Sequence, residues 1–316
     1  MKQVYLDNQS NTRMDDIVFD AMVPYFKQYY GNPQSIYSLG QISKDAIEEA
    51  RISVSKLINS KPEEIIFTSC GSESNNLAIK GYAYGNSKKG KHIIVSAIEH
   101  FSVLNAVKSL EKDGFEVTYV PVDSKGFVVL DELKKSIRQD TILVSIQYAN
   151  TEIGTVQNID EISKTAKEKN VALHVDGVVA AGVIPIDVVK SNIDMLTISS
   201  SVIYGPKGAA ALYVKKGIYL KPQIDGGVQE FNKRAGTENV PAIVGFGVAC
   251  SRALSQMQQN YEKIIKLRDK LINGLQKNID YIYLNGPTQN RLPTNVNFSI
   301  EFVEGESLFL CWMLKV

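Results

Sequence analysis

Residues 65–76 have the sequence Ile-Ile-Phe-Thr-Ser-Cys-Gly-Ser-Glu-Ser-Asn-Asn, and this stretch decides the fold. Its first four residues are apolar or β-branched, and side chains of this kind on both faces indicate a strand buried in a sheet. The small residues from Ser69 to Gly71 then predict a turn, and Ser72 with the polar residues after it predicts the start of a helix. A buried strand that leads directly into a helix is the repeating unit of an α/β protein.

The same alternation continues along the chain. Residues 43–58 and 159–168 carry apolar side chains at three- and four-residue steps, as amphipathic helices do. Together with the strands, this order predicts a doubly wound, mostly parallel sheet flanked by helices, with right-handed crossovers. Ligands of such sheets bind beyond the carboxyl ends of the strands, so functional residues are expected just after each strand. The further strands are predicted at 93–95, 117–120, 142–146, 172–175 and 195–198.

The last sixty residues do not follow this alternation of strands and helices. A long helix is predicted near 258–277, and Val296, Phe298 and Ile300 alternate as in a half-buried strand. We expect a second, smaller domain here, and an incomplete one, because the chain stops within the apolar stretch 310–316. The predicted division is an N-terminal segment of the small domain at 1–14, the large domain at 15–257, and the start of a truncated C-terminal small domain at 258–316.

Composition narrows the classes of partner. Lys and Arg number 35 against 34 Asp and Glu, a net charge of +1, which gives no electrostatic reason to expect nucleic acid or an anionic membrane. No apolar run reaches the roughly 18 residues that span a bilayer, and the N-terminus lacks a signal-peptide core, so a cytoplasmic protein is expected. Cys70, Cys250 and Cys311 follow no metal-binding spacing, which predicts free thiols and no metal site.

Several polar residues follow the predicted strands. Gly71 lets the backbone approach a ligand, and free N–H groups at a helix start with the Ser72 hydroxyl would bind a phosphate; the alternative is a plain helix cap. His100 could face a ligand or be a buried structural histidine. Asp176 could hold a protonated pyridine nitrogen, or serve only in a turn. Ser199 begins a hydroxyl-rich run that could complete a phosphate site.

In combination, these segments make the chain resemble the NifS/IscS-type cysteine desulfurases, pyridoxal-phosphate enzymes of aminotransferase class V. The resemblance covers essentially the whole chain and implies a fold type I transferase. The matching segments are residues 5–8, 30–33, 67–69, 73–76, 98–100, 152–155, 174–176, 204–208, 234–239 and 304–307.

The resemblance also implies roles for individual residues. Ser72 and Ser199 match residues that hold the cofactor phosphate. His100 matches the histidine that stacks on the pyridine ring and shuttles protons, and Asp176 matches the aspartate that pairs with the ring nitrogen. Thr237 matches a threonine that reaches the phosphate of the partner subunit, which implies a homodimer. The full set of expected cofactor-binding residues is Gly71, Ser72, Thr151, Asp176, Ser199, Ser201 and Thr237, with His100 as the catalytic residue.

The chain departs from the family pattern at the centre of that site. Val202 stands where the family has the lysine that forms the Schiff base, and Ser201 replaces the histidine before it. Lys207 matches a second, non-catalytic lysine. Val179 replaces a glutamine that contacts the cofactor, and Thr151 replaces an asparagine. The family's sulfur-accepting cysteine and substrate-binding arginine lie beyond the segment that this chain reaches.

These features predict a cysteine desulfurase-like protein of sulfur or iron–sulfur cluster assembly that is catalytically degenerate. Pyridoxal phosphate is its expected cofactor, without a lysine Schiff base. Its expected partners are a second copy of the chain and an iron–sulfur scaffold or sulfur-acceptor protein. The alternative is an active desulfurase that converts L-cysteine to L-alanine with pyridoxal phosphate held non-covalently. A class V transaminase or lyase is disfavoured because it needs the same lysine.

Overall fold

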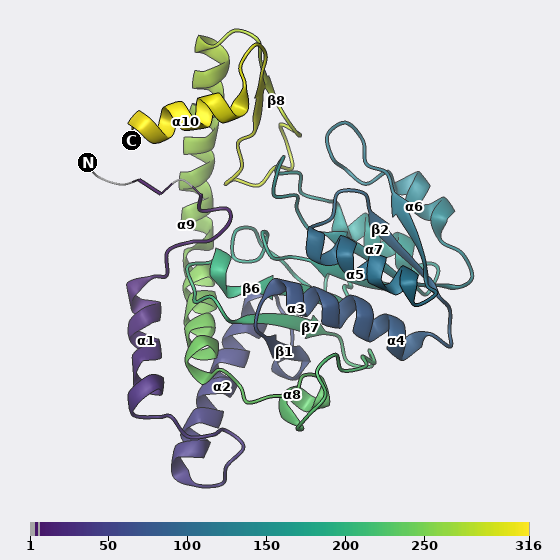
Figure 1. The fold of residues 1–316 in the computed structure, drawn as a ribbon, viewed down its shortest axis with the longest axis vertical. Helices are drawn as coiled ribbons and strands as arrows, with labels where there is room; N and C mark the ends of the chain where they lie inside the picture. Colours follow the sequence, from purple (N-terminus) through teal and green to yellow (C-terminus); the bar gives the residue numbers. More distant parts are fainter. Residues whose placement is uncertain (1–3, 6, 316) are drawn as a thin grey trace.

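A seven-stranded sheet forms the centre of the computed structural model, which describes residues 4–5 and 7–315 (Figure 1). The strand order is β1-β7-β6-β5-β4-β2-β3. Neighbouring strands are parallel except at β7, which runs antiparallel to both β1 and β6. The strands are β1 (Ile65–Thr68), β2 (His92–Ser96), β3 (Glu116–Val120), β4 (Thr141–Gln147), β5 (Ala172–Asp176), β6 (Met195–Ser199) and β7 (Ala210–Val214).

The six predicted strands are confirmed within one or two residues, and the mostly parallel sheet is confirmed with them. The sequence analysis missed β7, which is fully buried. Two of its five residues are alanine, a weak strand former, so the run Ala-Ala-Leu-Tyr-Val carries little local signal. Because β7 lies between β1 and β6, pairing on both sides stabilises it as a strand despite its weak strand-forming composition.

Helices cover both faces of the sheet. Successive residues of a strand point to opposite faces, so Phe67 of β1 packs into one hydrophobic core while Ile66 packs into the other. The first core lies under α1 (Asp16–Lys27), α2 (Ser38–Leu57), α6 (Leu130–Ser136), α7 (Ile159–Lys167) and α9 (Val240–Asn278). The second lies under α3 (Gly71–Asn76), the π-helical turn η2 (Leu77–Gly81), α4 (Tyr82–Asn86) and α5 (Phe101–Lys112).

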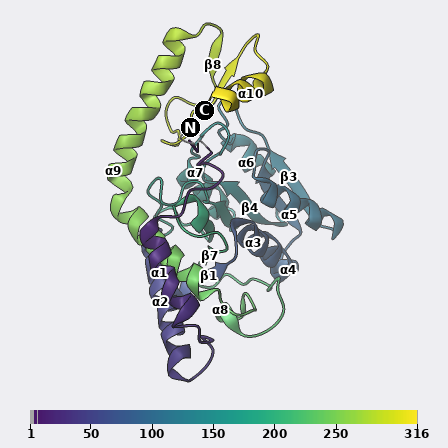
Figure 2. The ribbon, with the colours of Figure 1, turned by 60° about the vertical axis from the view of Figure 1, so that its left-hand side comes forward.

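Helix α9 joins the sheet to the C-terminal elements. Figures 1 and 2 show α1 and α2 against its first half, while the antiparallel pair β8 (Ile282–Leu284) and β9 (Phe298–Ile300) and helix α10 (Gly305–Lys315) lie near its other end. The buried residues of α9 all lie between Val240 and Cys250. The helix predicted near 258–277 is therefore the second half of a longer one. The proposed domain boundary at 257/258 falls inside α9, and the division into domains stays a prediction.

The crossing of α2 and α9 depends on a glycine. A Cβ atom added to Gly247 of α9 would lie 2.6 Å from Ala50 Cα and 2.7 Å from Ala50 Cβ of α2. Two helices approach this closely only where one lacks a side chain, so the contact fixes the distance between α9 and the helices beneath it.

Replacing Gly247 by alanine should therefore lower the free energy of unfolding by about 1–3 kcal/mol, because the added methyl group overpacks the crossing. Gly274→Ala is the matched control, since nothing lies within 4 Å of a Cβ at that position of the same helix. The control should gain about 0.5–1 kcal/mol from helix propensity. Denaturant unfolding of both variants measures the difference, and equal gains would show that the crossing has room for a side chain.

Candidate cofactor site

The predicted site residues lie at one edge of the sheet. Strands β1, β2, β5 and β6 run in the same direction, so the residues that end or follow them meet there. Asn75 connects three of the elements: its Nδ2 donates to Asp176 Oδ2 at 2.7 Å and to Ser102 Oγ at 2.8 Å. Ser102 Oγ in turn lies 2.7 Å from Nδ1 of His100. His100 follows β2 and Asp176 ends β5, as expected from the sequence, while their functional roles stay predictions.

Small residues and hydroxyl groups form one end of this site. A Cβ atom on Gly71 would lie 2.9 Å from Val178 Cγ2 and 4.0 Å from Ser199 Cβ, so the first turn of α3 packs closely against the ends of β5 and β6. Ser199 Oγ and Ser201 Oγ are 3.3 Å apart. Ser72 is exposed in the first turn of α3, and the helix is continuous from Gly71 to Asn86. This end offers backbone N–H groups and hydroxyls, the donor set that a phosphate needs.

Ser72 does not act as the helix cap that the sequence left as an alternative. The N-cap residue of α3 is Cys70, and its side chain makes no capping hydrogen bond. Glu73 instead accepts a hydrogen bond from the backbone N–H of Ser69 at 2.9 Å. The Ser72 hydroxyl is thus available to a ligand.

Asp176 is buried at the other end of the site, with only 7% of its surface exposed. Its carboxylate accepts hydrogen bonds from Asn75 and from the backbone N–H of Val178 at 3.1 Å, both neutral donors. Burial raises the pKa of Asp176, while Asn75, Val178 and the nearby His100 oppose the rise. Asn75 Oδ1 is buried without a partner among the described residues. A ligand with a protonated ring nitrogen would supply the cation that this carboxylate lacks.

The three histidines divide into two kinds. His174 lies inside the sheet between Ser145 Oγ (2.8 Å) and Thr197 Oγ1 (3.1 Å), and burial lowers its pKa to about 3. His92 is likewise buried between two threonine hydroxyls. His100 is exposed and caps α5, with Nδ1 accepting from the Ser102 N–H at 3.1 Å. The structural-histidine alternative therefore applies to the other two, and His100 keeps a free ring face.

The remaining predicted residues lie in the segments after β4 and β6 and in the loop before α9. The turn η3 (Ser200–Val202) follows β6, and its Ser201 carbonyl accepts from both the N–H and the hydroxyl of Thr12 at 3.0 Å. Val202 and Val179 are partly buried and pack on the hydrophobic core. Thr151 is half-buried in the loop after β4, and Thr237 is exposed on the loop before α9. The assigned roles of Thr151 and Thr237 stay predictions.

Sequence reasoning missed two residues of the site, Asn75 and Glu99. Glu99 is buried beside Asp176, where its Oε1 accepts from Ser96 Oγ at 2.5 Å and from the Gln147 N–H at 2.9 Å. Gln147 pairs directly with Asp176 across the sheet. Burial raises the pKa of Glu99 to about 8 against these hydrogen bonds, and the charge of Asp176 adds to the rise. An acidic residue directly before His100 was the available signal.

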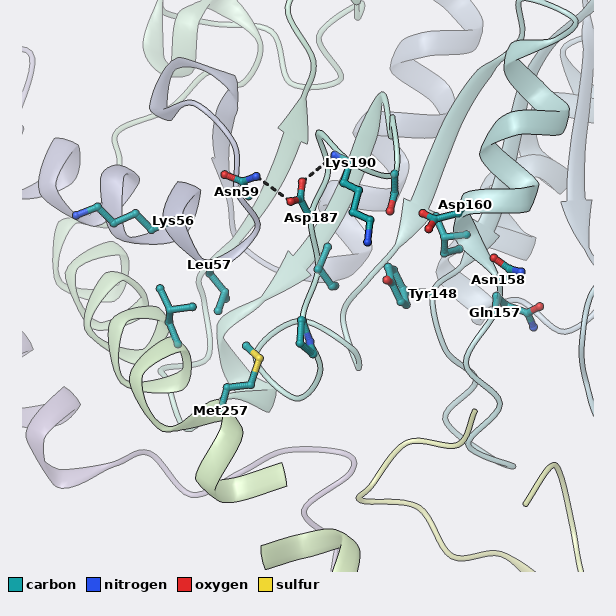
Figure 3. Close-up of a pocket in the computed structure, with 15 residues that line it drawn as sticks. Lys56, Leu57, Asn59, Tyr148, Gln157, Asn158, Asp160, Asp187, Lys190 and Met257 are labelled. Carbon is teal, nitrogen blue, oxygen red and sulfur yellow. Dashed lines mark hydrogen bonds between the residues drawn. The ribbon is translucent and has the colours of Figure 1, made fainter. Parts of the chain in front are cut away.

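A separate cavity of about 460 Å³ lies on the opposite face of the sheet, between the end of α2, the start of α7 and α9 (Figure 3). Leu57, Tyr148, Lys190 and Met257 line it. Asp187 in its wall accepts from Asn59 and from two backbone N–H groups, so this carboxylate stabilises a turn. None of the predicted cofactor-binding residues lines this cavity, so it does not change the location of the candidate site.

Among the residues that the structure describes, no group of three or more His, Cys, Asp or Glu side chains could hold a metal. Within the same part of the chain, every helix is too short or too polar to cross a bilayer.

Comparisons with known proteins agree with the geometry. The family model described as aminotransferase class-V matches residues 4–311. A cysteine desulfurase IscS of Dictyoglomus turgidum is 52% identical over 98% of this chain and 78% of its own length, and one of Methanosarcina thermophila is 50% identical over 98% and 76%. A solved NifS-like protein superposes with a TM-score of 0.94 at 39% identity, covering 97% of this chain and 84% of that one. A solved SspA in complex with cysteine gives 0.85 at 34% identity, covering 99% and 87%.

The buried Glu99 gives the protein a pH dependence that can be measured. The pKa of Glu99 is about 8 in the folded state, against about 4.3 in an unfolded chain, so folding favours the protonated form. This stabilisation is complete when the pH is below the pKa of Glu99 in the unfolded state. It is lost as the pH rises through the pKa in the folded state, and between these two pKa values the free energy of unfolding falls by roughly 1.4 kcal/mol for each pH unit. Denaturant unfolding between these pH values should show the loss in the wild type, and Glu99→Gln should reduce it.

Glu116→Gln is the control for this experiment, because Glu116 is exposed in an ion pair with Arg138. It should keep the slope of the wild type. An equal slope in Glu99→Gln would mean that Glu99 is ionised in the folded protein at neutral pH.

Proposed function

Because the chain belongs to the aminotransferase class V family and is similar along nearly its whole length to cysteine desulfurases, we propose that it is a cysteine desulfurase-like protein that holds its cofactor non-covalently and is catalytically degenerate. Its role is that of a scaffold or sulfur partner in sulfur or iron–sulfur cluster assembly in the cytoplasm. The observation that carries the proposal is Val202 at the end of η3, which by the family resemblance stands where the covalent lysine is expected.

The family's cofactor is pyridoxal phosphate, and the residues present fit its non-covalent contacts. The first turn of α3 with Gly71 and Ser72, together with the hydroxyls of Ser199 and Ser201, offers donors for the phosphate. Asp176 offers a buried carboxylate for the ring nitrogen, and His100 offers an exposed ring for stacking. When bound, pyridoxal phosphate supplies an electron sink for chemistry on amino acids.

The covalent contact does not fit. The side chain of valine has no amine, so the side chain of residue 202 neither bonds to an aldehyde nor moves a proton. Its side chain packs on the hydrophobic core together with that of Val179. Lys207 is exposed, beyond the buried Gly205 and Pro206. Binding therefore rests on the phosphate donors, Asp176 and His100 alone.

The alternative, an active desulfurase with non-covalently held cofactor, is favoured by the intact pair of Asp176 and His100. Both groups that would polarise the ring and transfer protons are in place. Formation of L-alanine from L-cysteine, assayed with added pyridoxal phosphate, would establish this alternative.

A homodimer belongs to the proposal. The family resemblance implies it through Thr237, and the exposed apolar side chains along α1 and the connection to α2 support it. Exposed fractions are 63% for Phe26, 72% for Tyr30, 95% for Ile36 and 55% for Tyr37. Clustered aromatic and aliphatic side chains of this kind mark protein–protein contact surfaces. The same proposal names an iron–sulfur scaffold or sulfur-acceptor protein as the further partner.

Borohydride reduction after titration with pyridoxal phosphate tests the central claim. The wild type should bind the cofactor without a reduced, covalent link to any lysine, and pyridoxamine 5′-phosphate should bind about as tightly, because no lysine distinguishes the aldehyde from the amine. Val202→Lys should gain a reducible link, located by peptide mapping. A link trapped on another lysine of the wild type would instead support the enzyme alternative.

Asp176→Asn should weaken binding of the cofactor about tenfold or more, because it removes the charge from a buried hydrogen bond. Asp187→Asn is the matched control, an aspartate outside the candidate site. It should leave the affinity unchanged. Fluorescence titration measures both variants, and equal affinities would remove Asp176 from the proposed site.

A further inference from the structure

A buried ion pair joins α2 to α8 (Gln229–Asn232), a short turn that precedes α9 and has non-helical backbone at Glu230 and Phe231. Arg51 Nη1 lies 2.8 Å from Glu230 Oε2, and Arg51 Nη2 lies 2.8 Å from Glu230 Oε1, so the pair is bidentate. Both residues also bind β1: Arg51 donates to the Ile65 carbonyl at 2.7 Å, and Glu230 accepts from the Phe67 N–H at 2.7 Å. The exposed fractions are 3% for Arg51 and 6% for Glu230.

This arrangement fixes geometry more than it adds stability. The free-energy cost of removing two charges from water offsets much of their mutual attraction. A buried ion pair is therefore better explained as a contact that selects one conformation of the chain. The Arg51 guanidinium also lies between two aromatic rings, 4.8 Å from the centroid of Phe67 and 5.0 Å from that of Phe231. The two rings fix the position of Arg51, and Arg51 together with the Phe67 N–H fixes the position of Glu230.

The backbone at this point is strained. Glu230, Phe231 and Asn232 have φ angles of 45°, 55° and 60°, three successive non-glycine residues in the left-handed region. Such residues persist only where their surroundings hold them. The hydrogen bonds of Glu230 to Arg51 and β1 are the contacts that hold the first of the three.

The strained turn directs Arg234 toward the cofactor site. Arg234 Nε donates to Glu73 Oε1 at 2.8 Å. The other oxygen of Glu73 accepts from both the N–H and the hydroxyl of Ser69, the residue that begins the turn into α3. Hydrogen bonds thus join Arg51 to Glu230, the backbone of residues 230–234 leads from Glu230 to Arg234, and Arg234 pairs with Glu73, which binds the backbone just before Gly71.

We propose that Arg51 and Glu230 are positioning residues that set the first turn of α3 for phosphate, acting through the turn 230–232 and the Arg234–Glu73 ion pair. The inference rests on the proposed function, in which this turn binds the cofactor phosphate. The pair of Arg51 and Glu230 lies outside the site and controls the conformation of its phosphate end.

Comparing pyridoxal phosphate with pyridoxal isolates the phosphate end, because the two ligands share every other group. Glu230→Gln should reduce the preference for the phosphorylated ligand about tenfold, the size of effect expected for a misplaced charged hydrogen bond. Its affinity for pyridoxal should stay within about threefold, since Asp176 and His100 are untouched. Arg234→Gln removes the ion pair with Glu73, which is less buried than the pair of Arg51 and Glu230. This variant should reduce the preference for the phosphorylated ligand by a similar factor. The double variant should be no worse than either single one.

Arg252→Gln is the matched control. Arg252 and Asp15 form an ion pair at 2.9 Å with side-chain exposures of 31% and 27%, close to the 23% and 19% of Arg234 and Glu73, but it joins α9 to the start of α1. The control should leave the preference unchanged. A folded Glu230→Gln protein with the wild-type preference, or additive losses in the double variant, would overturn the proposal.

A second measurement does not depend on the cofactor. Cys70 is exposed in the turn between Ser69 and Gly71, and Cys250 is buried. In a Cys311→Ser background, the rate at which a thiol reagent modifies Cys70 therefore reports the conformation of this turn. Glu230→Gln and Arg234→Gln should each change the rate several-fold, and Arg252→Gln should not. If the wild type binds neither ligand, the proposed function fails, and these rates alone decide whether the positioning chain exists.

Discussion

The common direction of β1, β2, β5 and β6 is the constraint on which the site depends. Parallel strands place their carboxyl ends at one edge, and this brings Gly71, His100, Asp176 and Ser199 together although long stretches of chain separate them. Strand β7 runs antiparallel to β1 and β6, so its amino end lies at that edge. Its role is to fill the space between β1 and β6, which keeps the first turn of α3 in contact with the end of β6.

Burial at this edge governs its electrostatics. Asp176 and Glu99 are both buried carboxyl groups, connected through Gln147, and two negative charges in such a place would repel each other. The raised pKa of about 8 for Glu99 leaves this group neutral at neutral pH, so the pair carries less charge than its composition suggests. The phosphate end presents uncharged donors, namely backbone N–H groups of α3 and the hydroxyls of Ser199 and Ser201.

Much of this could be predicted from the sequence, because buried strands and the residues after them have strong local signals. Ile65 to Thr68 and the glycine-bearing turn after them are examples. Other features have no local signal. Asn75 meets Asp176 across 101 residues, and that contact exists only in the folded sheet. Glu230, Phe231 and Asn232 adopt left-handed backbone without glycine, which propensity argues against and which tertiary contacts with Arg51 and β1 impose.

Val202 and Asp176 have contrasting surroundings. Val202 packs on the core, so the fold tolerates it, whereas Asp176 stays buried with only neutral donors around it. A ligand that brings a cation to Asp176 and an anion to α3 removes a cost that the ligand-free protein carries, and this gain requires no covalent bond. Any such ligand binds the folded chain in preference to the unfolded one and so stabilises the edge of the sheet. The non-covalent contacts of Asp176 and α3 are therefore enough to link the binding of such a ligand to the stability of this edge of the sheet.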